Sequence, residues 1–202
     1  IKADMVDQMD YDKILSMYQD RFKDASDFTF IFVGNVDVEK MKPVIAEYLG
    51  ALPAVNRKET FKDNKIEMRQ GIYKNEFTKQ QETPKASVFA FYNGDCKYDL
   101  RNNLLLSMTS QILDLVYTEK VREDEGGTYG VYVGGTLQKY PKEKAILQII
   151  FDTAPEKKEK LMKIIFGEID NITKTGPSEA NLNKVKEYML KKHTEDLKEN
   201  SY

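Results

Sequence analysis

The sequence predicts an α+β fold, a mostly antiparallel sheet with helices packed on one of its faces. Short runs of aromatic and β-branched residues alternate with longer segments whose apolar residues recur at helical spacing. Two of the short runs are joined by a connection that suits a hairpin, and hairpin-joined strands pair antiparallel. The order of strands and helices is also that of a split β-α-β arrangement, which places the helices in a layer against the sheet.

The first third of the chain predicts a helix, a strand and a second helix. Apolar residues at helical spacing indicate a helix within residues 5–22, and the continuous run at 28–33 indicates a buried strand. Asp37 is placed to cap a helix over residues 38–49. Pro43 falls inside that segment, so we expect a kink there or the end of a separate first turn.

The middle of the chain predicts two strands followed by a long helix. Mixed alternation around Gly71 indicates a long or bulged strand over residues 66–78. Residues 86–92 form a clearer strand pattern. The apolar stripe that follows predicts a helix from about residue 100 to Arg122.

The last third predicts a hairpin and two helices. Strands are expected over residues 127–135 and 145–151, and a helix is expected over 161–169. Ser178 follows a glycine and a proline, which is typical of the cap of a new helix. The apolar stripe of that last helix consists of Leu182, Val185, Met189, His193 and Leu197.

Length and composition indicate a globular protein with one domain over residues 1–202. Hydrophobic residues make up 41% and charged residues 32%, a balance that argues against insertion in a membrane. The net charge of -2 gives no basic excess for binding nucleic acid. Because Ile1 is not an initiator methionine and Tyr202 interrupts a helical pattern, we expect a piece of a longer protein whose compartment stays open.

Few residues of this sequence are candidates for binding a metal ion or for acting as an activated nucleophile. The chain has one histidine, His193, and one cysteine, Cys96, whereas a zinc site needs three or four ligands. We therefore predict no metal site and no cofactor in this chain. His193 belongs to the apolar stripe and is expected to pack there, while Cys96 lacks a nearby histidine to activate its thiol and is expected to be inert.

One pair of polar residues could act together as hydrogen-bond donors to a substrate. Arg122 ends the long predicted helix, and Tyr129 follows it by seven residues across a glycine turn. A guanidinium and a phenol at one sheet edge can donate hydrogen bonds to a carbonyl or an oxyanion. Alternatively, Arg122 complements the carboxyl end of the helix and Tyr129 packs across the sheet. The residue types alone leave both interpretations open.

Four segments together resemble the pitrilysin/insulinase family of zinc metallopeptidases. They are residues 28–37 (FTFIFVGNVD), 47–53 (EYLGALP), 122–130 (REDEGGTYG) and 176–185 (GPSEANLNKV). The resemblance covers nearly the whole chain. Within the family, the chain is most similar in kind to bacterial processing-peptidase-like members. It implies the repeat domain that pitrilysin and the mitochondrial processing peptidase share.

The resemblance implies a substrate-side role without a metal site. Members of the family carry a His-x-x-Glu-His motif in one half, and this chain has no such motif because its single histidine is followed by Thr194, Glu195 and Asp196. The chain therefore resembles the C-terminal, non-zinc half, whose Arg and Tyr hold the peptide and stabilise the tetrahedral intermediate. Carried over, these residues are Arg122 and Tyr129 as catalytic candidates.

The implied partners are peptide substrates and a zinc-bearing catalytic half, either in the same chain or in a separate subunit. The chain alone is expected to be inactive, and the zinc is expected in the catalytic half of the parent protein. Two alternatives stay open: a catalytically inactive assembly domain, and a peptide-binding subunit of a two-chain peptidase. A bacterial periplasm or envelope location is compatible with the family.

Overall fold

The computed structural model describes residues 2–123 and 130–200, with the side chains of 122 and 123 left out. The chain divides into two compact units. The first comprises residues up to Asn64 together with the last residues from Lys198, and the second comprises residues 65–197. The second unit holds the sheet and its helices.

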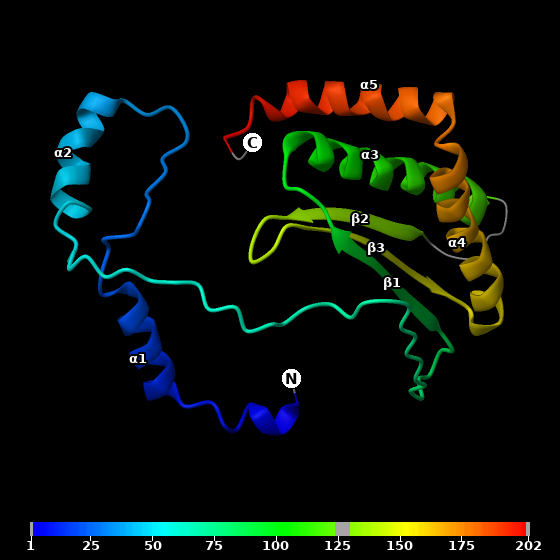
Figure 1. Ribbon diagram of the computed structural model, residues 1–202, viewed down its shortest axis with the longest axis horizontal. Coiled ribbons are helices and arrows are strands. Elements are labelled where there is room, and N and C mark those ends of the chain that lie inside the picture. The colour runs from blue at the N-terminus through cyan, green and yellow to red at the C-terminus, as the bar shows by residue number, and fades with distance from the viewer. Residues whose placement is uncertain (1, 124–129, 201–202) are drawn as a thin grey trace. The chain divides into compact units, whose positions relative to one another are not determined.

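The sheet has three antiparallel strands among the described residues. They are β1 (Ala86–Asp95), β2 (Val131–Gln138) and β3 (Lys144–Thr153), in the order β1-β3-β2 (Figure 1). The strands β2 and β3 form the predicted hairpin, and β3 continues the pairing with β1. This arrangement confirms the predicted antiparallel sheet.

The register of the strands separates a core face from an open face. Phe151 of β3 lies opposite Val88 of β1 and Val131 of β2, and these three side chains belong to the core or pack against it. The neighbouring row, with Ile150 between Phe89 and Tyr132, points to the other face, because successive side chains of a strand alternate. The helices cover the core face.

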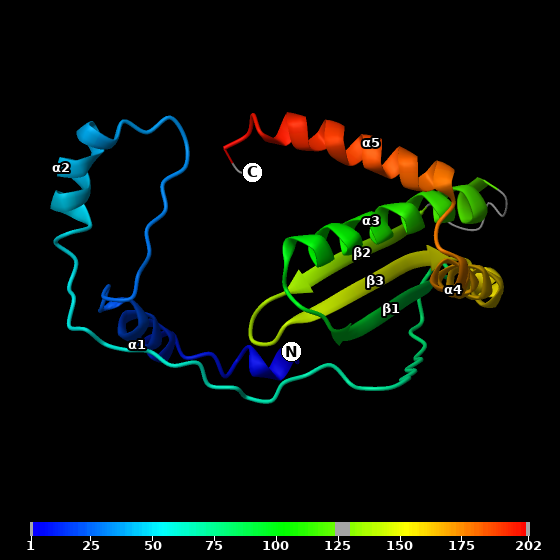
Figure 2. The same cartoon turned by 45° about the horizontal axis from the view of Figure 1, so that its top comes forward.

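Three α-helices belong to the described part of this unit. The first is α3 (Leu100–Tyr117), which continues as a π-helical segment, η2 (Thr118–Glu123); the others are α4 (Lys158–Thr175) and α5 (Glu179–Asp196). Figures 1 and 2 show α3 lying over β2 and α5 lying over α3. Helices on one face of an antiparallel sheet confirm the predicted α+β class.

Local sequence signals explain where these helices begin. The side chain of Asp99 accepts a hydrogen bond from the backbone N–H of Asn102 at 2.8 Å, and Ser178 accepts one from Asn181 at 3.2 Å. Each cap satisfies one of the N–H groups that the first turn of a helix leaves without a partner. Ser178 is therefore the cap that the sequence predicts.

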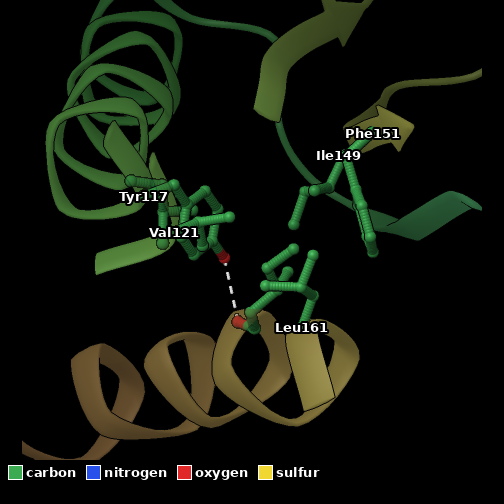
Figure 3. Packing of buried hydrophobic residues seen from close by; sticks show 7 residues of the cluster. Tyr117, Val121, Ile149, Phe151 and Leu161 are labelled. Atoms are coloured by element: carbon green, nitrogen blue, oxygen red, sulfur yellow. Dashed lines mark hydrogen bonds between the residues drawn. The ribbon is translucent and has the colours of Figure 1, made fainter. Parts of the chain in front are cut away.

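The hydrophobic core lies between the sheet and the helices. Figure 3 shows Tyr117 of α3, Val121 of η2, Ile149 and Phe151 of β3, and Leu161 of α4 packed together. Full burial of one such side chain stabilises the fold by roughly 1.5–3 kcal/mol relative to its exposure. Leu113 and Ile165 complete the buried cluster.

The first unit contains α1 (Tyr11–Phe22) and α2 (Val38–Tyr48), preceded by a short 3₁₀ turn, η1 (Ala3–Met5). Asp37 caps α2 as predicted, accepting a hydrogen bond from the N–H of Lys40 at 3.2 Å. Pro43 lies inside α2, which continues through it, so the alternative that a separate first turn ends there is wrong, while the expected kink stays a prediction. Proline has no N–H to donate to the carbonyl four residues before it, and the helix continues despite the loss of this one bond.

A buried carboxylate organises the loop between these two helices and the segment after α2. Asp24 is 4% exposed, and its oxygens accept hydrogen bonds from the N–H groups of Ser26, Val55 and Arg57. Arg57 in turn donates to the carbonyl of Asp20 at 2.7 Å. Polar contacts therefore connect α1 to residues 55–57.

Two predicted strands are absent from the described structure. Residues 28–33 are extended but exposed, and no strand among the described residues of the first unit is available to pair with them. Residues 66–78 are likewise extended without ladder pairing. A strand requires a partner along its backbone, and sequence pattern alone does not supply one.

Candidate functional site

The two site residues predicted from the sequence flank the connection between η2 and β2. The backbone of Arg122 lies in η2, while its side chain is outside the described part of the structure. Tyr129 lies outside the described residues altogether. The convergence of these two side chains therefore stays a prediction.

The core fixes the near end of this connection. Val121, the neighbour of Arg122, is fully buried against Tyr117 and the sheet. Lys120 pairs with Glu168 of α4 at 2.5 Å, which ties the same π-helical segment to a second helix. A π-helical turn is rare and occurs often at functional sites. The backbone of Arg122 thus directly follows a residue that packing holds in place.

The far end of the connection opens on a hollow of about 440 Å³. Its lining comprises Asp114 of α3, residues 130–132 at the start of β2, and residues 150–152 at the end of β3. Gly130, which follows Tyr129 directly, belongs to this lining. The hollow is large enough for one or two amino-acid side chains.

Asp152 gives the hollow a carboxylate. It accepts hydrogen bonds from the hydroxyl of Ser87 at 2.6 Å and from Lys85 at 2.9 Å. The Ser87 bond first, and then the Lys85 bond, hold the pKa of Asp152 below its ordinary value. Asp152 therefore keeps its negative charge at neutral pH.

The sequence reasoning missed Tyr132 and Ile150 as lining residues. They lie opposite each other on β2 and β3, on the face of the sheet away from the helices, and Tyr132 is 55% exposed. The alternation of Gly130, just before β2, with Tyr132 and Gly134 of that strand was the available signal, because it places one aromatic side chain between two positions that have none.

No zinc site fits the part of the chain that the structure describes. Among those residues, no group of three or more His, Cys, Asp and Glu side chains is placed to hold a metal ion. The described residues therefore offer no ligand set for a zinc ion.

His193 lies at an exposed position of α5, so the expected packing in an apolar stripe is wrong. Val185, earlier in the same stripe, is buried. Figure 2 shows α5 diverging from α3 toward its C-terminal end, which explains why the later part of the stripe is uncovered.

Cys96 is half-buried, and its sulfur approaches the carbonyl of Lys97 at 3.9 Å.

Comparison with known protein families decides the relationship. The family described as the peptidase M16 inactive domain matches residues 8–189. The chain belongs to this family. The match confirms the resemblance seen in the sequence and includes the segment from Arg122 to Tyr129.

Individual relatives of this M16 inactive domain are distant in sequence. A protein of Arabidopsis thaliana named zinc protease PQQL-like is 22% identical over 94% of this chain. The periplasmic protease PqqL of Escherichia coli has a similar fold, with a TM-score of 0.68 and 19% identity over 83% of the chain. The ferredoxin protease FusC, solved in complex with Arabidopsis ferredoxin, also gives 0.68, with 13% identity over 98%.

This chain spans only about a fifth of the length of each of these proteins. It covers 21% of the plant protein, 18% of PqqL and 21% of FusC. Each relative therefore contains a large part that has no counterpart in this chain. Among the described helices of the domain, none combines the length and the hydropathy that a membrane span requires.

Proposed function

We propose that this chain is the substrate-side domain of a zinc-dependent metalloendopeptidase. In this proposal Arg122 and Tyr129 bind the peptide and stabilise the tetrahedral intermediate, while the zinc and the general base belong to a catalytic half. The observation that carries the proposal is the placement of the two described residues that flank this pair. Val121, just before the pair, is anchored in the core, and Gly130, just after it, lines the hollow beside β2 and β3.

The chemistry of the two side chains suits this role. The guanidinium of Arg122 is permanently charged and can donate to the carbonyl oxygen that becomes an oxyanion. The phenol of Tyr129 adds a neutral donor. Donors that are already in place before the reaction stabilise developing charge without the cost of reorganising water.

The peptide itself would extend from these donors into the hollow. Tyr132 and Ile150 offer apolar contact there, and Asp152 offers a carboxylate at the end of β3. One related structure holds a bound ferredoxin, so protein substrates are a reasonable class for the parent of this domain. We therefore expect the hollow to accept a side chain that is apolar and carries a donor at its tip.

The test uses the parent protein that contains both halves. Arg122→Ala and Tyr129→Phe are each compared with the unaltered enzyme in peptide hydrolysis, with kcat and KM measured separately. Loss of one preorganised donor to an oxyanion costs about 100- to 1000-fold in kcat. The matched controls are Arg101→Ala on the exposed surface of α3 and Tyr140→Phe in the exposed hairpin connection.

Each result has a definite meaning. A large fall in kcat for the two site variants, with unchanged thermal unfolding and normal controls, supports the proposal. Turnover of Arg122→Ala within about threefold of the unaltered enzyme contradicts the catalytic role. A parent that hydrolyses no peptide with zinc present would favour an assembly domain, and activity that requires a second polypeptide would favour the peptide-binding subunit.

A further inference from the structure

The hollow beside β2 carries negative charge that its own lining does not balance. Two carboxylates line it, that of Asp114 on α3 and that of Asp152 on β3. None of the lining residues that the structure describes is a lysine, an arginine or a histidine. A concave site with charge of one sign attracts groups of the opposite sign. The hollow therefore favours a cationic occupant.

The two carboxylates differ in what they contact. Asp152 is already engaged, because it accepts a hydrogen bond from Ser87 and forms an ion pair with Lys85 at 2.9 Å. Among the residues that the structure describes, no hydrogen bond or ion pair engages the side chain of Asp114, which lies at an exposed position of α3. Asp114 is therefore the carboxylate that can bind an added cation.

The rest of the lining suits the stem of a long basic side chain. The side chain of Tyr132 lies over Gly134, since a Cβ atom at Gly134 would be 2.5–3.0 Å from three of its atoms. Gly134 thus leaves space for the tyrosine ring along the open face of the sheet, beside Ile150. Lysine and arginine pack their methylene groups against such apolar surface, and an aromatic ring also attracts the charged end.

The hollow is close in sequence to the proposed oxyanion donors. Gly130, one of its lining residues, directly follows Tyr129. Successive residues of an extended peptide are about 3.3 Å apart, so a peptide that reaches this region presents its side chains at short intervals. The residue that enters the hollow is therefore expected close to the bond that is cleaved.

We propose that the hollow is a specificity site for one basic residue of the peptide, a lysine or an arginine, whose charged end binds Asp114. The stem of this side chain packs on Tyr132 and Ile150, while Asp152 stays paired with Lys85. The inference rests on the proposed function and adds a substrate class to it, namely peptides that carry a basic residue close to the cleaved bond.

The test measures binding to the full parent protein, so that its result does not depend on turnover. A zinc chelator prevents hydrolysis, and fluorescence anisotropy gives the Kd of three labelled peptides. The peptides share a background of alanine and serine and differ at one residue, which is lysine, norleucine or glutamate. We expect the lysine peptide to bind about tenfold more tightly than the norleucine peptide, because hydrogen bonds to charged groups are the stronger ones. The glutamate peptide should bind more weakly than either.

Four variants of the parent protein locate the cause of this preference. Asp114→Asn should bring the Kd values of the lysine and norleucine peptides within about twofold of each other, because the charge is lost. Asp114→Lys should reverse the order, so that the glutamate peptide binds more tightly than the lysine peptide. Lys85→Ala removes an ion pair of Asp152 and should strengthen the preference for lysine. The matched control is Glu187→Gln, at an exposed position of α5 outside the hollow, which should keep the preference.

Thermal unfolding shows whether each variant is folded. Equal affinity of the unaltered parent protein for the lysine and norleucine peptides would overturn the proposal, and so would a lysine preference that survives both substitutions of Asp114. The proposed function fails through a different measurement, the kcat of Arg122→Ala with zinc present. A lysine preference that depends on Asp114 supports the site even if Arg122→Ala retains turnover. Loss of turnover in Arg122→Ala without any lysine preference removes the site and leaves the proposed function in place.

Discussion

The hydroxyl of Tyr117 donates a hydrogen bond to the backbone carbonyl of Ile165 at 3.0 Å, joining α3 to α4 inside the core (Figure 3). Both residues are almost completely buried. Burial raises the pKa of the Tyr117 hydroxyl, so it stays protonated and remains a donor throughout the physiological range. This bond fixes how the helix that leads to Arg122 sits against the helix behind it.

Replacing Tyr117 with phenylalanine should lower the free energy of unfolding by about 1 kcal/mol, because a buried neutral hydrogen bond is lost while the ring is retained. Chemical denaturation measures the change. The matched control is Tyr140→Phe, whose hydroxyl is on a side chain that is 76% exposed. Equal stability of the Tyr117→Phe variant and the unaltered chain would mean that this bond contributes nothing.

The same variant has a consequence at high pH. A folded-state pKa above the ordinary tyrosine value gives stability that is fully present below about pH 10 and is lost as the pH rises beyond it. The unaltered chain should therefore lose stability above about pH 10 more steeply than Tyr117→Phe. Parallel curves for the two proteins would contradict the assignment.

Gly135 of β2 is required by the close approach of α3. A Cβ atom at this position would lie 2.6 Å from the hydroxyl oxygen of Ser110 and 2.7 Å from Cγ of Leu106. Gly135→Ala should therefore lower the free energy of unfolding by about 1–3 kcal/mol through overpacking. The control is Gly94→Ala in β1, where a Cβ would meet no atom within 4 Å.

Thermal and chemical unfolding of both glycine variants separate the packing effect from a general effect of glycine replacement. Gly94→Ala should change stability by no more than about 0.5 kcal/mol, as expected for a surface position. If both variants lose the same stability, the contact between α3 and β2 is not the cause.

Acid should weaken the first unit through Asp24. The side-chain hydrogen bond from Ser26, together with the backbone N–H groups of Val55 and Arg57, lowers the pKa of Asp24 to about 2. A depressed pKa gives stability that is present above the unfolded value of 3.8 and is lost as the pH falls from there through about 2. Helix content measured between pH 6 and pH 2 should fall in that window.

Asp24→Asn removes the titrating group and should flatten this acid transition while lowering stability at neutral pH. Asp27→Asn, at an exposed position three residues on, is the matched control and should leave the transition in place. Asp20, whose pKa is lowered to about 2 chiefly by Lys23, contributes to the same window, so some pH dependence should persist in Asp24→Asn. An unaltered transition in Asp24→Asn would exclude the proposed cause.

The sequence correctly predicted those features of the fold that depend on residues close to one another in the chain. The caps at Asp37 and Ser178 act on N–H groups three residues away, and the hairpin depends on a connection of a few residues. The long helix ends at η2, close to the predicted limit at Arg122, because its apolar stripe runs that far. The structure confirms each of these expectations.

The failed expectations depend on contacts distant in sequence. Residues 28–33 have the composition of a strand, and residues 66–78 have part of its alternation, but neither segment pairs with a strand in the part of the chain that the structure describes. His193 follows the apolar stripe of α5, yet α3 covers only the earlier part of that stripe. Pairing and coverage are properties of the assembled chain and leave no mark in a short window of sequence.

For the candidate site, the sequence by itself determined the residue types, the seven-residue spacing of Arg122 and Tyr129, and the shortage of metal ligands, because these follow from the order of residues. Only the tertiary structure decided that the connection begins at a core residue, Val121, and that Gly130 opens on a hollow with Tyr132 and Asp152. The physical reason is that a hollow arises where separate strands and helices meet, and their meeting is set by packing across the whole unit.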